Sequence, residues 1–211
     1  MVSSQLAGSK IVPLERSFYE RSTQVVAFEL IGKVLVFKQN GNLLSGKIVE
    51  TEAYFGANDP ASHAYRGVTL RNRVMFGRAG ISYVYFTYGN HHCLNIVTEA
   101  EGIPGAVLIR ALEPISGVQI MQKRRGKIIY GQLTNGPGKL TQAFGITRDH
   151  SGMDLTKEPF FVTQNEKQNQ PMPIQVSTRI GISRAKQMPL RFYLQTNPFV
   201  SVKLRQDSNG L

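Results

Sequence analysis

The chain has a single cysteine, Cys93, among its 211 residues. One cysteine excludes an internal disulfide and a cysteine-rich zinc site. No apolar run is long enough to span a bilayer, and the N-terminal residues lack the apolar core of a signal peptide. These absences favour an intracellular, soluble protein without a membrane partner, and we expect it in the cytoplasm.

Several motifs of known catalytic sites are also missing. The chain has no phosphate-binding glycine loop, no nucleophile elbow and no zinc-deaminase pattern of His-x-Glu with Cys-x-x-Cys. The run His91-His92-Cys93 is followed by no further ligand spacing, and adjacent strand residues point to opposite faces. We therefore expect neither a metal site nor a cofactor.

Acidic residues are few. The chain has 14 Asp and Glu against 25 Lys and Arg, so its formal net charge is +11. Between Asp59 and Glu99, and again between Glu113 and Asp149, all charges are basic. Such a surplus of positive charge predicts a polyanionic partner. Nucleic acid is the first candidate, and an acidic membrane surface is the second. Association with a ribosome is the simplest alternative for any small basic protein.

The length and the 41% hydrophobic content suit one domain with a sizeable core. We expect a single α+β domain over residues 1–211, with a flexible N-terminal tail at 1–13. A capping box at residues 17–20 begins a predicted helix that ends at Gly32. The remaining pattern predicts helices over 116–125 and from about 138 to 144, and antiparallel strands at 34–37, 46–56, 82–88, 93–98, 106–112, 160–163, 175–182 and 190–194.

The predicted strand at 46–56 has an unusual composition. Its alternation puts Glu50, Glu52 and Tyr54 on one face, while Val49 and Thr51 take the other. A buried carboxylate must be paired, protonated or functional. The simpler alternative is an edge strand whose two glutamates face water.

Arg110 is the one charge in the apolar run 106–112. If this strand is central, the guanidinium needs a carboxylate; otherwise it lies at a strand end and reaches water. Pairing with Glu52 would lower the pKa of that carboxyl and keep it ionised, as a general base requires.

Aromatic residues and a long loop provide further candidates. Tyr83 and Tyr85 share a strand face and fit a core. Tyr88, beside the predicted turn at Gly89-Asn90, is more exposed than packing would favour and is a candidate wedge between bases. His63 lies in the irregular loop 56–80, where a histidine is more often structural than catalytic, although loops of this length usually have a function.

Together these segments resemble the alkyladenine (3-methyladenine) DNA glycosylase family from about residue 14 to about residue 201. Several separate motifs in the family's order make the resemblance specific. They are Val49-Glu50-Thr51-Glu52-Ala53-Tyr54, His63, Arg71-Asn72-Arg73, Tyr83-Val84-Tyr85 with Tyr88-Gly89 and Asn95, Arg110-Ala111-Leu112-Glu113-Pro114, Gly136-Pro137 with Lys139-Leu140, and Pro189-Leu190-Arg191-Phe192-Tyr193.

The resemblance implies a monofunctional DNA glycosylase of base excision repair. Such an enzyme flips an alkylated or deaminated purine out of double-stranded DNA and hydrolyses its N-glycosidic bond with water, without cleaving the strand. The implied fold is a curved, mostly antiparallel sheet flanked by helices, similar to the C-terminal module of formyl-transferring enzymes. The implied partner is duplex DNA with damaged purines, bound by a monomer that associates with the nucleoid.

At the matching positions, Glu52 would be the general base that activates the water, and Arg110 would help to hold it. Tyr88 would intercalate into the duplex. The residues expected to line the base pocket are Tyr54, His63, Tyr85 and Asn95. The residues expected to contact the DNA backbone or a groove are Arg71, Arg73, Met75 and Lys139.

Two positions near the turn depart from the family pattern. Asn90 stands where an apolar residue is common, and His92 where an aromatic is frequent, which affects how the turn packs. The alternative function is a non-catalytic, basic nucleic-acid-binding module. A carboxylate facing phosphates would weaken such a module, so Glu52 with Arg110 favours the enzyme. The preferred damaged base and the role of His91 stay open.

Overall fold

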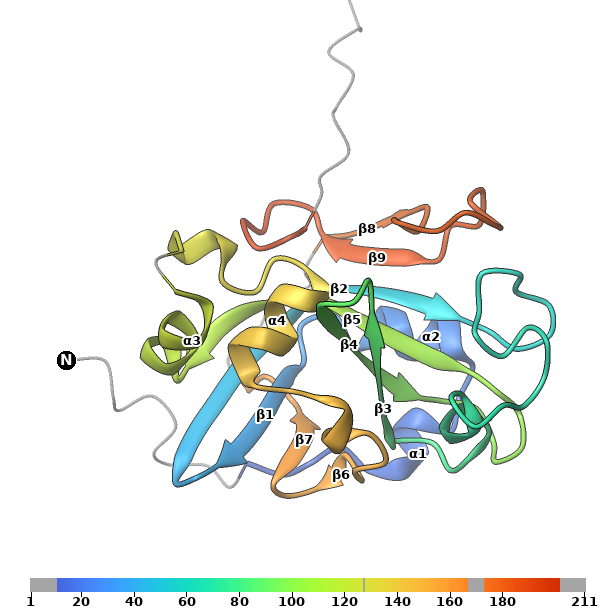
Figure 1. Ribbon diagram of the computed structural model, residues 1–211, viewed down its shortest axis with the longest axis horizontal. Coiled ribbons are helices and arrows are strands. Elements are labelled where there is room, and N and C mark those ends of the chain that lie inside the picture. The colour runs from blue at the N-terminus through green and yellow to red at the C-terminus, as the bar shows by residue number, and fades with distance from the viewer. Residues whose placement is uncertain (1–10, 127, 167–172, 202–211) are drawn as a thin grey trace, which may run out of the picture.

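The structure, a computed structural model, describes residues 11–126, 128–166 and 173–201. Within these ranges, nine strands form one curled sheet in the order β3-β4-β5-β2-β1-β7-β6, with β9 on β2 and β8 on β9 (Figure 1). All of these pairs are antiparallel. The strands are β1 (Val34–Gln39), β2 (Asn42–Tyr54), β3 (Ser82–Thr87), β4 (His91–Val97), β5 (Ala106–Ser116), β6 (Thr156–Lys157), β7 (Phe160–Thr163), β8 (Ile174–Ser177) and β9 (Arg191–Leu194).

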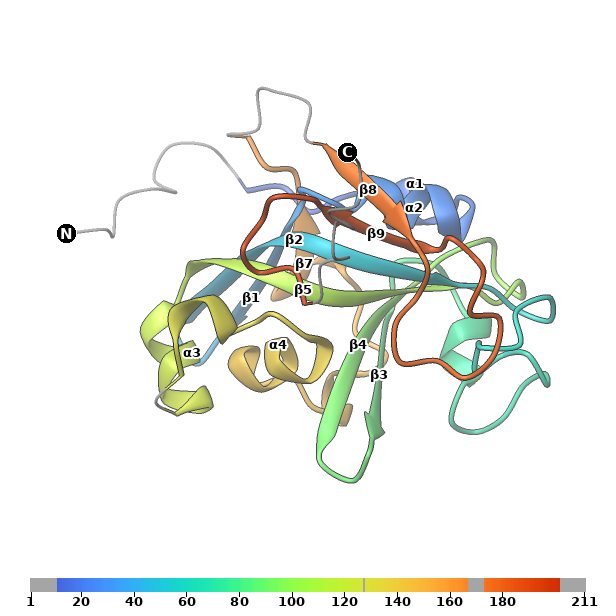
Figure 2. The ribbon, with the colours of Figure 1, turned by 90° about the horizontal axis from the view of Figure 1, so that it is seen from above.

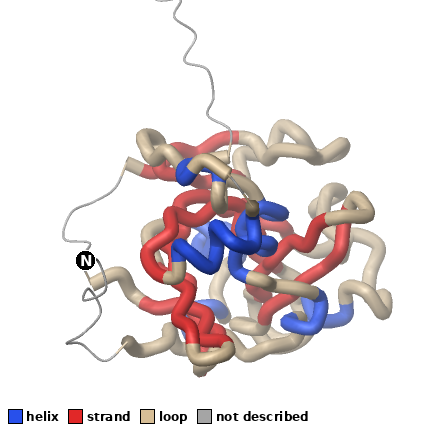
Figure 3. Tube along the Cα trace, turned by 60° about the vertical axis from the view of Figure 1, so that its left-hand side comes forward, coloured by secondary structure: helices blue, strands red, loops and turns tan. Residues whose placement is uncertain are grey.

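Helices cover both sides of this sheet. The α-helices are α1 (Arg16–Tyr19), α2 (Thr23–Glu29), α3 (Val118–Arg125) and α4 (Pro137–Phe144), and the 3-10 helices are η1 (Arg73–Phe76), η2 (Tyr130–Gln132) and η3 (Arg148–His150). Figure 2 shows α1 and α2 on one side of β2 and β5, and α3 and α4 on the other. In Figure 3 the strands curve around helical segments near the centre. The predicted α+β class and the antiparallel sheet are confirmed.

Strand β2 is the centre of the fold. Its residues 45–54 pair with β5, while its other edge pairs first with β1 and then, at residues 50–52, with β9. Bulges in the pairing with β5 lie beside Glu50 and bend the strand there. The hydroxyl of Thr51 donates to the carbonyl of Ala27 in α2 at 2.8 Å, so one face of β2 packs on that helix. The predicted alternation therefore leaves Glu50 and Glu52 on the opposite face.

The predicted helix from residue 17 to Gly32 is in fact two short helices, α1 and α2. Ser17 lies inside α1 and forms no capping box, because the helix begins after Glu15. Glu99 arrives from a distant loop and accepts hydrogen bonds from the backbone N–H and the hydroxyl of Thr23, at 2.6 and 2.7 Å. These bonds satisfy free donors at the start of α2 and allow a new helix to begin there.

One predicted boundary near the end of the chain is also wrong. The strand expected at 175–182 ends at Ser177, and the chain then leaves the sheet. Within the expected tail 1–13, residues 1–10 lie outside the described residues, but Pro13 forms a β-bridge with Thr163, and the carbonyl of Val12 accepts the Thr163 hydroxyl at 2.6 Å. Residues 12 and 13 therefore contact β7, and the flexible tail stays a prediction. None of the described helices combines the length and apolarity needed to cross a bilayer.

Candidate active site

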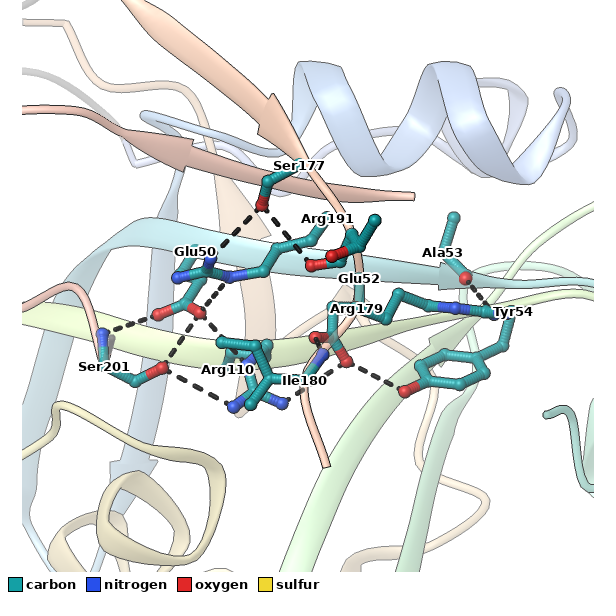
Figure 4. A network of polar contacts seen from close by, with 11 residues as sticks. Glu50, Glu52, Ala53, Tyr54, Arg110, Ser177, Arg179, Ile180, Arg191 and Ser201 are labelled. Atoms are coloured by element: carbon teal, nitrogen blue, oxygen red, sulfur yellow. Dashed lines mark hydrogen bonds and ion pairs between the residues drawn. The ribbon is translucent and has the colours of Figure 1, made fainter. Parts of the chain in front are cut away.

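Charged side chains from β2 and β5 meet inside the apolar core (Figure 4). Glu50 and Glu52 are fully buried, and Arg110 is 8% exposed. The Nε of Arg110 donates to Glu50 Oε1 at 3.0 Å, and its Nη1 donates to Glu52 Oε2 at 3.3 Å. The predicted pairing of Arg110 with Glu52 is thus confirmed, and the alternative of an arginine reaching water from a strand end is wrong. The edge-strand alternative for the two glutamates is wrong as well.

Glu50 is held by more partners than the sequence suggested. Its Oε1 accepts from Arg191 Nε at 2.7 Å and from the Ser201 hydroxyl at 2.9 Å, and its Oε2 accepts the Ser201 N–H at 2.7 Å. No role was predicted for Arg191 or Ser201. A signal for Arg191 did exist, because it is a lone charge in the apolar run 190–194, as Arg110 is in its own strand.

Glu52 accepts hydrogen bonds on both carboxylate oxygens. The hydroxyl of Tyr54 donates to Oε2 at 2.8 Å, and the backbone N–H of Ile180 donates to Oε1 at 2.8 Å. Burial raises the pKa of Glu52 above its ordinary value, and the opposing effects of Arg110, Ile180 and Tyr54 offset only part of that rise. The expectation that Arg110 would bring this pKa down is therefore wrong in its net direction, because enclosure of the carboxylate outweighs the pairing.

A cavity of about 600 Å³ opens beside Glu52. That volume lies within the range of sites for small ligands. Tyr54, Arg110 and Ile180 all line the cavity and all contact Glu52, so the carboxylate lies directly behind its wall. The structure thereby brings Glu52 and Arg110 together with the residues predicted for the pocket, which are Tyr54, His63, Tyr85 and Asn95.

Neutral aromatic side chains form much of this wall. The rings of His63 and Tyr85 meet edge to face with centroids 4.5 Å apart, and His63 Nδ1 hydrogen-bonds the Tyr83 hydroxyl at 2.9 Å. Burial raises the pKa of Tyr83 to about 12 and lowers the pKa of His63, so both groups are uncharged at neutral pH. Tyr83, expected only as a core residue, is buried and also lines the pocket.

Asn95 and Met75 lie deep in the same wall. Asn95 is 4% exposed, and its Nδ2 donates to the carbonyl of Tyr83 at 3.1 Å, which fixes the direction of the side-chain amide. Met75 is 2% exposed and packs with Ala64 and Tyr83. Its burial at the pocket contradicts the prediction of a backbone or groove contact by Met75, because the segment 73–76 folds into η1 and turns this side chain inward.

Tyr88 is 82% exposed at the turn between β3 and β4. The N–H of Asn90 donates to the Thr87 carbonyl at 3.3 Å, so the central residues of the turn are Tyr88 and Gly89, not Gly89 and Asn90 as expected. Both have positive φ, 52° and 70°. A bulky residue rarely adopts this backbone conformation, which usually marks a functional position.

Helix α4 packs against the hairpin that carries Tyr88. The hydroxyl of Thr141 donates to the carbonyl of His92 at 2.9 Å. A Cβ on Gly138 would come within 2.9 Å of the His91 ring, so only glycine permits this close approach. The helix therefore limits how far the hairpin can move, and His91 contributes to that packing.

The other residues predicted to contact DNA lie around the pocket. Arg71 and Arg73 line a second hollow of about 630 Å³, and Tyr85 lies between the two cavities. Lys139 Nζ donates to Asn135 Oδ1 at 2.8 Å at the start of α4. These positions are compatible with DNA contacts, which stay a prediction. Within the described ranges, no three His, Cys, Asp or Glu side chains are grouped so that they could hold a metal ion.

Comparison with known proteins identifies the family of this fold and site. The model of the methylpurine-DNA glycosylase family matches residues 17–198. A protein of Carboxydothermus hydrogenoformans is 51% identical over 191 residues, which cover 90% of this chain and 99% of that protein. A protein of Chlorobium luteolum is 50% identical over 189 residues, covering 89% and 96%, and one of Methanoculleus marisnigri is 50% identical over 190 residues, covering 89% and 98%.

Each of these three relatives bears the provisional name 3-methyladenine DNA glycosylase. The family match spans most of the chain and includes every residue of the site except Ser201. The chain therefore belongs to the methylpurine-DNA glycosylase family and is a DNA glycosylase, which hydrolyses an N-glycosyl bond of DNA.

Proposed function

We propose that this protein flips an alkylated or deaminated purine out of duplex DNA into the cavity beside Glu52 and releases the base by hydrolysis. A base inside a duplex is inaccessible, so flipping must come first, at a cost of a few kcal/mol. Tyr88, exposed at the tip of a hairpin that packs on α4, would fill the gap left in the stack. The net charge of +11 suits binding to phosphates.

The pocket favours damaged purines for an electrostatic reason. A purine alkylated on a ring nitrogen is cationic, and the faces of Tyr54 and Tyr85 attract a cation by about 0.5–2 kcal/mol. His63 is neutral and does not repel that charge. The side-chain amide of Asn95 lies in the wall, where it would distinguish purines by their exocyclic groups.

The observation that carries this proposal is a fully buried Glu52 whose three contacts line the pocket. Glu52 would accept a proton from a water molecule as the water oxygen bonds to C1′ of the deoxyribose. As this bond forms, the C1′–N bond breaks, and its electron pair leaves with the base. A cationic base departs as a neutral molecule, so activation of the water is the main requirement.

The same pocket supports a monofunctional enzyme. A glycosylase that also cleaves the strand uses an amine as nucleophile and passes through a Schiff base. The described residues that line the pocket include no lysine. The expected product is an intact strand with an abasic site.

Duplex oligonucleotides that carry one hypoxanthine, one ethenoadenine or random methylation test the proposal. After incubation with the protein, we expect free base from at least one substrate, and strand breaks only after alkali. Strand breaks without alkali would contradict the monofunctional mechanism. No base release from any substrate, with intact binding to duplex DNA, would favour a non-catalytic binding module.

A further inference from the structure

Another buried ion pair lies behind the pocket wall, beside the ring of Tyr54. Arg179 Nη1 and Nη2 donate to the two carboxylate oxygens of Asp59 at 2.6 and 2.8 Å. Both side chains are fully buried. Neither residue lines the cavity, so neither touches a base bound there.

This pair connects three segments around the site. Arg179 also donates to the carbonyl of Ala53 at 2.9 Å, and its guanidinium lies 4.6 Å from the centre of the Tyr54 ring (Figure 4). Asp59 accepts the N–H groups of Phe55 and Ala61, each at 3.1 Å. The end of β2, the loop that follows it and the segment after β8 are thus tied together at one point.

The immediate neighbours of the pair form the catalytic pocket. Ile180 follows Arg179 in the chain and donates its N–H to Glu52, and residues 180–184 line the cavity. Pro60 and Ala61 follow Asp59 and also line it. A buried ion pair is weak evidence for stability, because desolvation of both charges offsets their attraction. Its geometry here points instead to the alignment of the groups around Glu52.

We propose that Arg179 and Asp59 are positioning residues, which hold the Tyr54 hydroxyl and the Ile180 N–H against the Glu52 carboxylate. The inference rests on the proposed role of Glu52 as the general base. Arg179 acts through the ring that it contacts and through the peptide group next to it, while Asp59 fixes the guanidinium from two sides. Loss of the pair would displace both donors to Glu52 together.

The test uses Arg179→Lys, Asp59→Asn and the double variant in single-turnover base release from a lesion-containing duplex. We expect each single variant to lose about 10- to 100-fold in rate, because small misplacements at a reacting centre have effects of that size. The Kd for undamaged duplex DNA should stay within about twofold, since that binding depends on phosphate contacts and not on the pocket wall. The double variant should be no slower than the slower single variant, because the two residues act as one unit.

The pH profile separates positioning from general loss of structure. With the Ile180 N–H displaced, the ionised form of Glu52 loses a donor, so the acid limb of the profile should move to higher pH. Apart from Tyr54, the charged and titratable groups around Glu52 stay in place in these variants. They are Glu50 on β2, Arg110 on β5, Cys93 on β4 and Arg191 of β9, which contacts Glu50.

Arg16→Lys is the matched control, because Arg16 forms a partly buried ion pair with Asp154 at 2.9 Å, away from the pocket. This variant should excise at the wild-type rate. Wild-type rate and an unmoved acid limb in Arg179→Lys and Asp59→Asn would overturn the proposal. If both variants failed to fold while Arg16→Lys folded, the pair would support the whole fold, and the specific role in positioning would be rejected.

A carbon-13 NMR titration of the Glu52 carboxyl in wild type and Arg179→Lys needs no substrate. If the pKa of Glu52 were higher in Arg179→Lys than in the wild type, and the wild type released no base, the proposed function would be rejected and the positioning role kept. Normal base release with no shift in the titration would reject the positioning role and keep the proposed function.

Discussion

Ion pairs join β2 and β5 at two places, in very different surroundings. Near one end, Lys47 lies directly opposite Glu113, with 2.6 Å between Nζ and Oε2 and side chains that are 23% and 33% exposed. Further along β2, Arg110 binds Glu50 and Glu52, whose side chains are fully buried. The first pair keeps contact with water, whereas the second is enclosed by the core.

The difference in burial changes what each pair indicates. An exposed pair contributes about 0–1 kcal/mol to stability and needs no special explanation. A buried pair gains little over apolar residues of the same volume, but loss of one partner costs about 3–5 kcal/mol because a charge stays unpaired. The two buried glutamates of β2 are therefore better explained by chemistry than by folding.

The largest expected effect on stability comes from a substitution that breaks the buried pair. Arg110→Ala leaves Glu50 with Arg191 and Ser201 but removes the only cation in contact with Glu52 among the described residues. We expect the free energy of unfolding, measured with urea, to fall by about 3–5 kcal/mol. Lys47→Ala, the control from the exposed pair, should lose no more than about 1 kcal/mol. Equal losses would remove the distinction between the two pairs.

Local pattern was sufficient to predict much of this arrangement. The alternation in 46–56 gives the face of Glu50, Glu52 and Tyr54, and a lone charge in an apolar run predicts a partner for Arg110. The helix prediction failed because Glu99, 76 residues away in the chain, provides the acceptor that starts α2 at Thr23. Such a contact leaves no trace in the local sequence.

The parts of the site that the sequence did not predict were missed for the same reason. Ile180 contacts Glu52 through its backbone N–H across 128 residues of chain, and any residue type supplies that donor. Ser201 reaches Glu50 across 151 residues. Met75 was misplaced because the direction of its side chain depends on how η1 packs, not on its own neighbours. Contacts made by the backbone, or between distant segments, could not be inferred from residue identity.

The next prediction concerns an exposed residue. Unlike the buried Arg110, it should matter for DNA binding and not for stability. Tyr88→Ser removes the exposed ring at the hairpin tip. Base–aromatic stacking contributes about 1–3 kcal/mol, so the Kd for a lesion-containing duplex should rise by about 5- to 150-fold. Affinity for a single strand should change less, because a wedge acts only in a duplex.

Val12→Ser is the control for that experiment, since Val12 is 58% exposed beside β7. Its affinity for both forms of DNA should equal that of the wild type. Equal losses for duplex and single strand in Tyr88→Ser would count against intercalation by Tyr88.

The smallest expected effect is a dependence of stability on pH. Since burial raises the pKa of Glu52 in the folded state, the stability that its protonated form contributes is complete below the ordinary pKa of about 4.3 and is lost as the pH rises through the folded value. Glu52→Gln cannot ionise. Its thermal midpoint should exceed that of the wild type at pH 7, and the difference should shrink toward pH 4. A difference that grows on acidification would contradict the direction of this shift.

The most direct test of the account compares Glu52→Gln with Glu113→Gln, the same substitution in the buried and the exposed pair. In single-turnover base release from a lesion-containing duplex, the account predicts a loss of about 10²- to 10⁴-fold for Glu52→Gln, with unchanged affinity for the DNA. Glu113→Gln should release base at the wild-type rate. Base release by Glu52→Gln at the wild-type rate, or equal losses in both variants, would contradict the assignment of Glu52 as the general base.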